Sequence, residues 1–269
     1  MGTTMTGRVH VVAGGYPPGA LGGHDIDYAR FKLLELLADE GLRATVGNDF
    51  TDIDRWLPGT QLMITYLAGP YLDDGQNQVV RQWLDEGGHW LALHGSSGGK
   101  AARVGDSKRR RMVKTSHHDT LGGFFLSHPP IRKIRVDVVD TSHPLTKGLP
   151  ESFEVIDEPY MIEIQHPSET QLLLTAELGP DDSALDTGFV YDKDTALLPD
   201  GKTRVLGYIR RVGKGGVTYI ALGHCHSPAS QNRLSAAATT GDRPAVLRNT
   251  WESEAYIQLL RNAIEWGVG

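Results

Sequence analysis

The first hundred residues alternate short apolar runs, rich in β-branched residues, with amphipathic helical segments. Runs at residues 9–13, 43–46 and 62–67 predict buried strands. Such alternation is typical of crossover units that build a parallel sheet covered by helices on both faces. The pattern therefore constrains the N-terminal part of the chain to an α/β fold.

Two helices are predicted between these strands. The first spans residues 27–40 and ends at Gly41, and the second begins after the capping residue Asp73 and stops at Gly87. The residues expected to face the sheet are Phe31, Leu34, Leu37 and Ala38 in the first helix and Val79, Val80, Trp83 and Leu84 in the second. A strand at residues 89–94 follows, so His94 is expected at the carboxyl end of a central strand.

The second half of the chain predicts strands without long helices between them, which favours an antiparallel extension. These strands lie at residues 131–139, 153–164, 172–176, 205–210 and 217–222. Glycine-rich residues 213–216 predict a hairpin turn, and a capping box at Asn249 predicts a last helix with Tyr256, Leu259, Leu260, Ala263 and Ile264 buried. We interpret residues 1–269 as a single domain with surface insertions near 100–115 and 228–248.

Charge and cysteine content exclude several classes of function. Lys and Arg total 27 against 33 Asp and Glu, and this mildly acidic balance disfavours a nucleic-acid partner. The lone cysteine, Cys225, indicates a reducing compartment, so we expect a cytoplasmic protein. No run approaches the ~20 apolar residues of a membrane span, so no membrane partner is expected.

Several of the eleven histidines follow predicted strands. His94 ends one strand, His24 lies in the loop after the first strand, and His224 follows the strand at residues 217–222. In an open α/β sheet, ligands bind beyond the carboxyl ends of the strands, so these side chains are expected to converge. The remaining candidates on such loops are Asp25, His117, His118, His128 and His226. Asp157, Glu158 and Tyr160 belong to the same set if their predicted strand bends at Pro159.

Six sequence blocks, in order along most of the chain, resemble the trehalose-utilisation (ThuA-like) family. They are HWLALHGSSGG at 89–99, LGGFFLSHP at 121–129, HPLTKGLP at 143–150, FEVIDEPY at 153–160, GKGGVTYIALGH at 213–224 and IEWG at 264–267. The resemblance implies the flavodoxin-like, class I glutamine amidotransferase-like fold. It therefore implies a mostly parallel central sheet flanked by helices.

His94 stands where class I amidotransferases carry their nucleophilic cysteine. An imidazole does not replace a thiolate in that acyl transfer, so glutaminase activity is not expected. Residues 95–99 also match the G-x-S-x-G elbow of serine hydrolases, which makes a serine esterase using Ser97 a further alternative. Residues 100–111 are charged and lack the buried stripe of the helix that should follow such an elbow.

The resemblance implies a carbohydrate substrate: trehalose, another glycoside or a keto-sugar. We expect His94 and Glu158 to transfer protons, with His224 as their partner, in isomerase, lyase or hydrolase chemistry. The residues expected to bind the sugar are His24, Asp25, Tyr66, His118, His128, Asp157, Tyr160 and His226. The alternative from another class is a noncatalytic sugar-binding or sensory protein.

A metal site is the second interpretation of the same histidines. His94, His128 and His224, or a subset of them with Glu158, form a ligand set suited to zinc or another divalent ion. No other cofactor is indicated.

Residues 100–114 carry seven basic side chains against one acidic one. This segment either steers an anionic sugar, contacts a neighbouring subunit in a homo-oligomer, or forms a solvated surface.

Overall fold

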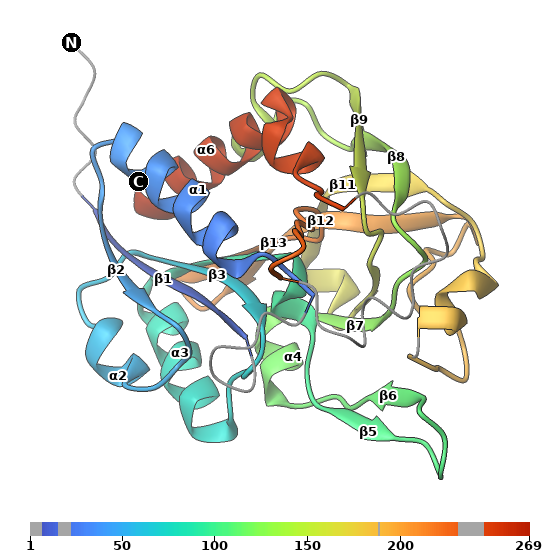
Figure 1. Ribbon diagram of the computed structural model, residues 1–269. Coiled ribbons are helices and arrows are strands. Elements are labelled where there is room, and N and C mark those ends of the chain that lie inside the picture. Colours follow the sequence, from blue (N-terminus) through green and yellow to red (C-terminus); the bar gives the residue numbers. More distant parts are fainter. Residues whose placement is uncertain (1–6, 16–22, 188, 231–244) are drawn as a thin grey trace.

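The computed structural model describes residues 7–15, 23–187, 189–230 and 245–269, and it shows a central nine-stranded sheet flanked by helices (Figure 1). The strand order is β2-β1-β3-β4-β13-β12-β11-β8-β9. The strands are β1 Arg8–Gly15, β2 Arg43–Gly47, β3 Leu62–Ala68, β4 His89–Leu93, β8 Arg132–Val138, β9 Ser152–Asp157, β11 Thr170–Glu177, β12 Thr203–Val212 and β13 Gly215–Ile220.

One half of the sheet is parallel, as the alternating sequence pattern predicts. Strands β2, β1, β3, β4 and β13 all run in the same direction. Helices α1 (Ile26–Asp39) and α6 (Glu254–Val268) lie over one face of this half, and α3 (Asp74–Glu86) lies on the other (Figure 1). The carboxyl ends of the parallel strands consequently meet at one edge, where the candidate residues were expected.

The other half of the sheet is the predicted antiparallel extension. Strands β12, β11, β8 and β9 each pair antiparallel with the preceding strand in the sheet order, starting from β13. The β12–β13 hairpin turns at Gly213, whose φ of 59° lies in the left-handed region that glycine tolerates. This arrangement confirms the expected fold class.

Two helix predictions need correction. Phe31, which is 61% exposed, and Ala38, which is also exposed, do not face the sheet, because the buried side of α1 (Ile26–Asp39) carries Ala29, Leu33 and Leu36 together with the predicted Leu37. Asn249 does not open the last helix: residues Asn249–Glu252 form a 3₁₀ turn, and α6 starts at Glu254. The apolar stripe predicted for the last helix is buried as expected.

The segment at residues 153–164 is not one strand. It divides into β9 and β10 (Met161–Ile164), and β10 pairs with β7 (Gly123–Ser127) in a separate two-stranded sheet. Pro159 lies in the interruption, where its missing N–H cannot continue a hydrogen-bonded ladder. The break releases Glu158 from the sheet toward the carboxyl edge of the parallel strands.

The basic insertion forms a small hairpin that projects from the body of the molecule (Figure 1). Its strands are β5 (Ala101–Arg103) and β6 (Arg110–Met112), and Arg111 is paired with Asp192. Of the second predicted insertion, residues 231–244 lie outside the described residues.

The remaining short helices are α2 (Ile53–Trp56) and α4 (Ser116–Leu121), with 3₁₀ turns at His94–Ser97, Pro144–Thr146, Pro167–Glu169 and Asp182–Thr187. Among the residues that the structure describes, no helix has the length and apolar character needed to cross a lipid bilayer.

Candidate functional site

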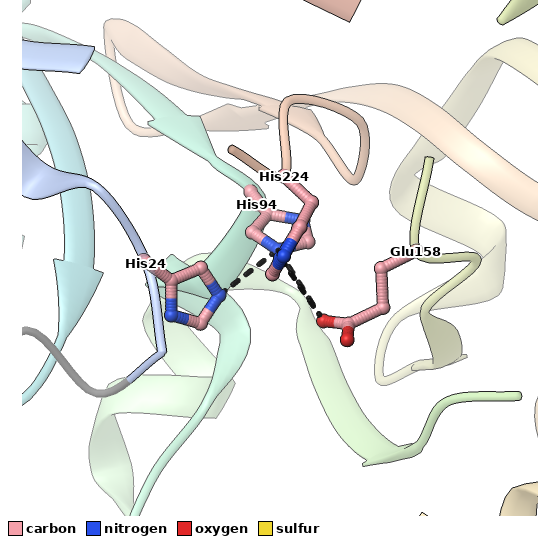
Figure 2. A group of neighbouring side chains, drawn as sticks. All are labelled: His24, His94, Glu158 and His224. Carbon is pink, nitrogen blue, oxygen red and sulfur yellow. Dashed lines mark hydrogen bonds and ion pairs between the residues drawn. The ribbon is translucent and has the colours of Figure 1, made fainter. Parts of the chain in front are cut away.

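Four side chains from distant segments meet at the carboxyl edge of the parallel strands (Figure 2). His94 directly follows β4, His224 lies just beyond β13, His24 precedes α1, and Glu158 leaves the end of β9. One ligating atom from each lies within 4.8 Å of those of the other three. The expected convergence of strand-end histidines with a carboxylate is therefore present, and we call these four residues the His–Glu cluster.

The backbone at His94 makes a sharp turn. Its φ of 42° is unusual for a residue with a side chain and lies in the left-handed region. Gly95 follows it because a Cβ at that position would lie 2.0 Å from the Leu67 carbonyl oxygen. The His94 imidazole is oriented by its Nδ1–H, which donates to the Ala221 carbonyl at 2.7 Å.

The cluster is built around Nε2 of His94. This nitrogen lies 3.1 Å from Nε2 of His24 and 3.3 Å from Nδ1 of His224. Oε2 of Glu158 lies 3.7 Å from the same nitrogen and 3.4 Å from Nδ1 of His224. Three imidazoles and one carboxylate thus direct their polar atoms at one point.

Burial controls the charge of the cluster. It lowers the pKa of His94 well below its ordinary value, and the neighbouring His24 and His224 lower it further. Burial alone would raise the pKa of Glu158, but the imidazoles of His128, His224 and His94 outweigh it and hold that pKa well below its usual range. Near neutral pH the centre therefore combines a neutral His94 with an ionised Glu158.

Asp157 fixes the loop that carries His224 instead of facing the cluster. Its buried carboxylate accepts hydrogen bonds from the backbone N–H groups of Gly223 at 2.7 Å and His224 at 3.0 Å, and from the Thr250 hydroxyl at 2.6 Å. Burial raises its pKa to about 6, while these donors favour the charged form. Sequence reasoning placed Asp157 among sugar-binding residues, whereas its contacts here are with the protein backbone and Thr250.

His128 and Tyr160 surround the cluster without joining it. Nδ1 of His128 lies 3.2 Å from Oε1 of Glu158, the carboxylate oxygen that does not take part in the cluster. The ring of Tyr160 packs on His94 with centroids 4.0 Å apart, and its hydroxyl is 3.4 Å from Nε2 of His24. Compared with the metal-ligand set that the sequence suggested, His24 takes the place of His128, and Glu158, which that set already included, joins His94 and His224.

The structure places Tyr66 and His226 behind the cluster. The Tyr66 hydroxyl donates to the Gly223 carbonyl at 3.0 Å, so this tyrosine supports the same loop as Asp157. Nδ1 of His226 contacts Nε2 of His224 at 3.0 Å. Tyr66 therefore supports the loop that carries His224, and His226 contacts the cluster residue His224 directly.

Asp25 caps α1 and forms an ion pair with Arg248, whose guanidinium lies over the Tyr28 ring. Arg248 was not among the residues predicted from the sequence. It lies at the end of the predicted insertion at 228–248, and its sequence position alone does not indicate the ion pair with Asp25. Cys225 lies beside these groups, and burial raises the pKa of its thiol to about 12. That thiol therefore stays protonated and is a poor nucleophile.

His118 lies away from the cluster, beneath the turn that follows His94. Its Nδ1 accepts from the Thr115 backbone N–H at 3.0 Å and its Nε2–H donates to the Gly98 carbonyl at 3.0 Å. His117 similarly contacts the Ser96 carbonyl at 2.7 Å. These contacts hold the turn in place and do not bring His118 to the site for which the sequence suggested it.

The Ser97 hydroxyl lacks the partner that a hydrolase nucleophile needs. Its hydrogen bonds among the described residues are to the His94 carbonyl at 3.3 Å and the Tyr219 hydroxyl at 2.8 Å. Burial raises the pKa of Tyr219, so neither partner accepts the Ser97 proton as a general base does. This geometry does not support the serine-esterase alternative.

Comparisons with known proteins agree with the architecture. A family model described as trehalose utilisation (ThuA) matches residues 19–241. A putative ThuA-like protein from Bacteroides uniformis superposes with a TM-score of 0.63 and 15% identity, covering 99% of this chain and 93% of its own. A second one, from Parabacteroides merdae, gives a TM-score of 0.58 and 16% identity over 97% of this chain and 90% of its own.

A β-galactosidase from Rahnella sp. R3 also shares part of the fold. It matches 82% of this chain with a TM-score of 0.53 and 16% identity, but only 29% of the β-galactosidase chain is covered. No curated protein matches the sequence. At these identities, the structural similarities establish the fold alone.

Proposed function

Because this chain belongs to the trehalose-utilisation (ThuA) family, we propose that it is a cytoplasmic enzyme that processes a carbohydrate. The proposed substrate is trehalose, another glycoside or a keto-sugar derived from one. One observation carries the proposal: His24, His94, His224 and Glu158 converge at the carboxyl edge of a parallel sheet, where α/β proteins bind their ligands.

The His–Glu cluster is a set of electron-pair donors. An ionised Glu158 and a neutral His94 can accept a proton from a carbon next to a sugar carbonyl, or hold a cation that polarises that carbonyl. Removal of that proton gives an enolate. Its reprotonation at a different carbon or face yields an isomer or epimer, and expulsion of the β-oxygen cleaves a glycosidic bond.

The surroundings of the cluster suit a polyhydroxylated ligand. His128 is more exposed than the four cluster residues, and its imidazole lies against Glu158. Burial and the Glu158 charge raise the pKa of Tyr160 well above its ordinary value, so its hydroxyl keeps a proton that it can donate. Such groups can exchange hydrogen bonds with sugar hydroxyls.

The test is turnover of a defined panel of sugars. The protein is incubated with trehalose, other disaccharides, glycosides and their 3-keto forms in deuterated buffer, and products and deuterium uptake beside the carbonyl are followed by NMR. His94→Ala and Glu158→Gln should each lower turnover by more than about a hundredfold, in line with typical contributions of general catalysts. His166→Ala is the matched control, because His166 pairs with Asp119 outside the cluster.

Three outcomes decide the proposal. Loss of turnover in the two cluster variants, with activity retained in His166→Ala, supports it. Saturable sugar binding without turnover or deuterium exchange favours the noncatalytic sugar-binding alternative instead. Full activity in both cluster variants would contradict the proposal that the reaction takes place at the His–Glu cluster.

A further inference from the structure

The spacing of the His–Glu cluster matches the coordination shell of a metal ion. Four donor atoms bound to a tetrahedral zinc ion, each about 2.0–2.1 Å from it, lie about 3.3 Å from one another. The separations here are 3.1 Å for His24–His94, 3.3 Å for His94–His224, 3.4 Å for His224–Glu158 and 3.7 Å for His94–Glu158, and all four donors lie within 4.8 Å of one another, so a small inward shift of the side chains completes such a shell. We propose that Nε2 of His24, Nε2 of His94, Nδ1 of His224 and Oε2 of Glu158 bind one divalent transition-metal ion of the zinc class.

Several electron-pair donors crowd around Nε2 of His94. Because the Ala221 carbonyl can only accept, Nδ1 of His94 carries the proton and Nε2 carries a lone pair. An sp² nitrogen accepts one well-aligned N–H, yet this lone pair faces two imidazole nitrogens and, at 3.7 Å, a carboxylate oxygen. A lone pair and a carboxylate oxygen repel each other, and a cation between them converts that repulsion into attraction.

The surrounding residues hold the donors as the neighbours of metal ligands do. Ligating histidines usually donate their second ring N–H to a carbonyl or carboxylate, as His94 does to Ala221. Nδ1 of His128 lies 3.2 Å from Oε1 of Glu158 and so leaves Oε2 for the ion. Asp157 anchors the backbone N–H of His224. These contacts are independent of the donor separations and point to the same ligand.

The donor set indicates the kind of metal. Three imidazole nitrogens and one carboxylate oxygen favour zinc and its transition-metal neighbours over Mg²⁺ and Ca²⁺, which prefer shells of oxygen ligands. The nearby thiol of Cys225 is directed at the Asp25 carbonyl and the Tyr66 hydroxyl, and it does not belong to the convergent group. We therefore expect a mononuclear site.

Metal content tests this inference without any sugar. The protein is expressed without an affinity tag, purified without nickel resin and analysed by elemental mass spectrometry. The metal-free chain, prepared with a chelator, is titrated with Zn²⁺ by calorimetry and with Co²⁺ by visible absorption. We expect one ion per chain, the ligand-field spectrum of four- or five-coordinate Co²⁺, and no comparable binding of Mg²⁺ or Ca²⁺.

Substitutions locate the ion. Glu158→Gln and His94→Ala should lose more than about a hundredfold in Zn²⁺ affinity, while His128→Gln, which changes only a neighbour of a ligand, should lose about 10–100-fold. His166→Ala should bind as the wild type does. Circular dichroism checks that each variant folds. The metal stoichiometry and the Co²⁺ spectrum of the wild type test the site even if a variant does not fold.

The inference is overturned if the metal-free wild type takes up no stoichiometric ion, or if the ligand substitutions leave the affinity unchanged. Failure of the metal inference and failure of the sugar-processing proposal are distinguishable. If the protein binds zinc but turns over no sugar, the metal inference holds and the sugar-processing proposal fails. If it turns over sugar without a bound ion, the sugar-processing proposal holds and the metal inference fails.

Discussion

His118 shows how a buried histidine can be structural. It closes a capping box at the start of α4, where its ring accepts from the Thr115 backbone N–H. Glutamine is a usual residue at this third helical position, because its amide oxygen can make the same contact. Its amide N–H groups can also donate to the Gly98 carbonyl that His118 contacts now.

His118→Gln should make the protein less sensitive to acid. Burial lowers the pKa of His118 to about 4, so only the unfolded chain binds a proton there as the pH falls from 6.5 toward 4. This difference in proton binding lowers the free energy of unfolding of the wild type by about 2 kcal/mol at pH 5. Urea unfolding therefore measures the free energy of unfolding at pH 7.5 and at pH 5. The decrease between the two pH values should be smaller in His118→Gln than in the wild type by about this amount. Equal losses in both proteins would contradict the prediction.

The sequence predicted which residues lie near the site, but not which of their side chains point into it. His94 and His224 were predicted because each follows a strand, and position after a strand is visible in sequence. Glu158 was predicted on the condition that its strand bends at Pro159, and the break between β9 and β10 meets that condition. The direction in which a side chain points is not visible: His24 joins the cluster, whereas Asp157, next to Glu158, points to the loop backbone. His118 and Tyr66 have equally suitable chemistry but contact backbone carbonyls.

At the scale of elements, the 3₁₀ turn at His94–Ser97, which directly follows β4, depends on Gly95. Gly95→Ala should prevent stable folding or lower the free energy of unfolding by several kcal/mol, because its Cβ would lie 2.0 Å from the Leu67 carbonyl oxygen. Gly75→Ala is a matched control in the first turn of α3, where the new Cβ meets only Asp73 Oδ1 at 3.5 Å. It should stabilise the protein by roughly 0.4–1 kcal/mol. Thermal and urea unfolding check both; a harmless Gly95→Ala would contradict the close contact.

The loop after β13 depends on the carboxylate at the end of β9. The Asp157 carboxylate accepts from the Gly223 N–H and the Thr250 hydroxyl. In Asp157→Asn an amide N–H group faces one of these donors, so a buried hydrogen bond is lost. The free energy of unfolding should fall by about 1–3 kcal/mol. Asp140→Asn is the control, because that half-buried residue accepts solvent-exposed hydrogen bonds from Ser142 in a surface turn. Urea titrations at pH 7.5 compare the two, and equal stabilities would show that Asp157 does not anchor the loop.

The elements that sequence reasoning missed are those defined by long-range pairing. Residues 153–164 look like one strand because apolar residues continue on both sides of Pro159. Their division becomes visible only when β10 pairs with β7, some forty residues earlier in the chain. The β5–β6 hairpin was likewise read as an insertion of unspecified structure, because its charged sequence lacks strand periodicity.

At the scale of the whole molecule, the His–Glu cluster joins segments from both halves of the chain. Zn²⁺ bound there at 100 times its dissociation constant adds about 2.7 kcal/mol to the free energy of unfolding. For a chain of this length the melting temperature should then rise by roughly 5–10 °C. Scanning calorimetry with zinc and with a chelator measures the shift, which should shrink in Glu158→Gln. Identical melting under both conditions would count against a site linking these segments.

The overall architecture was more predictable than the site. The parallel half follows from alternating apolar runs and helices, which are local patterns, and the hairpin at Gly213 follows from local turn chemistry. The cluster depends on contacts between residues separated by 70 and 130 positions, which the fold creates and no local pattern records.

The left-handed backbone at His94 has a consequence for how this scaffold changes its chemistry over evolution. The bend is maintained by the packing of Gly95 against Leu67 and by the Tyr219 hydroxyl, which donates to the His94 carbonyl at 2.9 Å, so the bend does not depend on the imidazole. A side chain that tolerates this left-handed backbone would be presented to the same interior point. Replacement of this one residue would thus alter the chemistry available at the cluster while the strands, helices and loops around it are inherited intact.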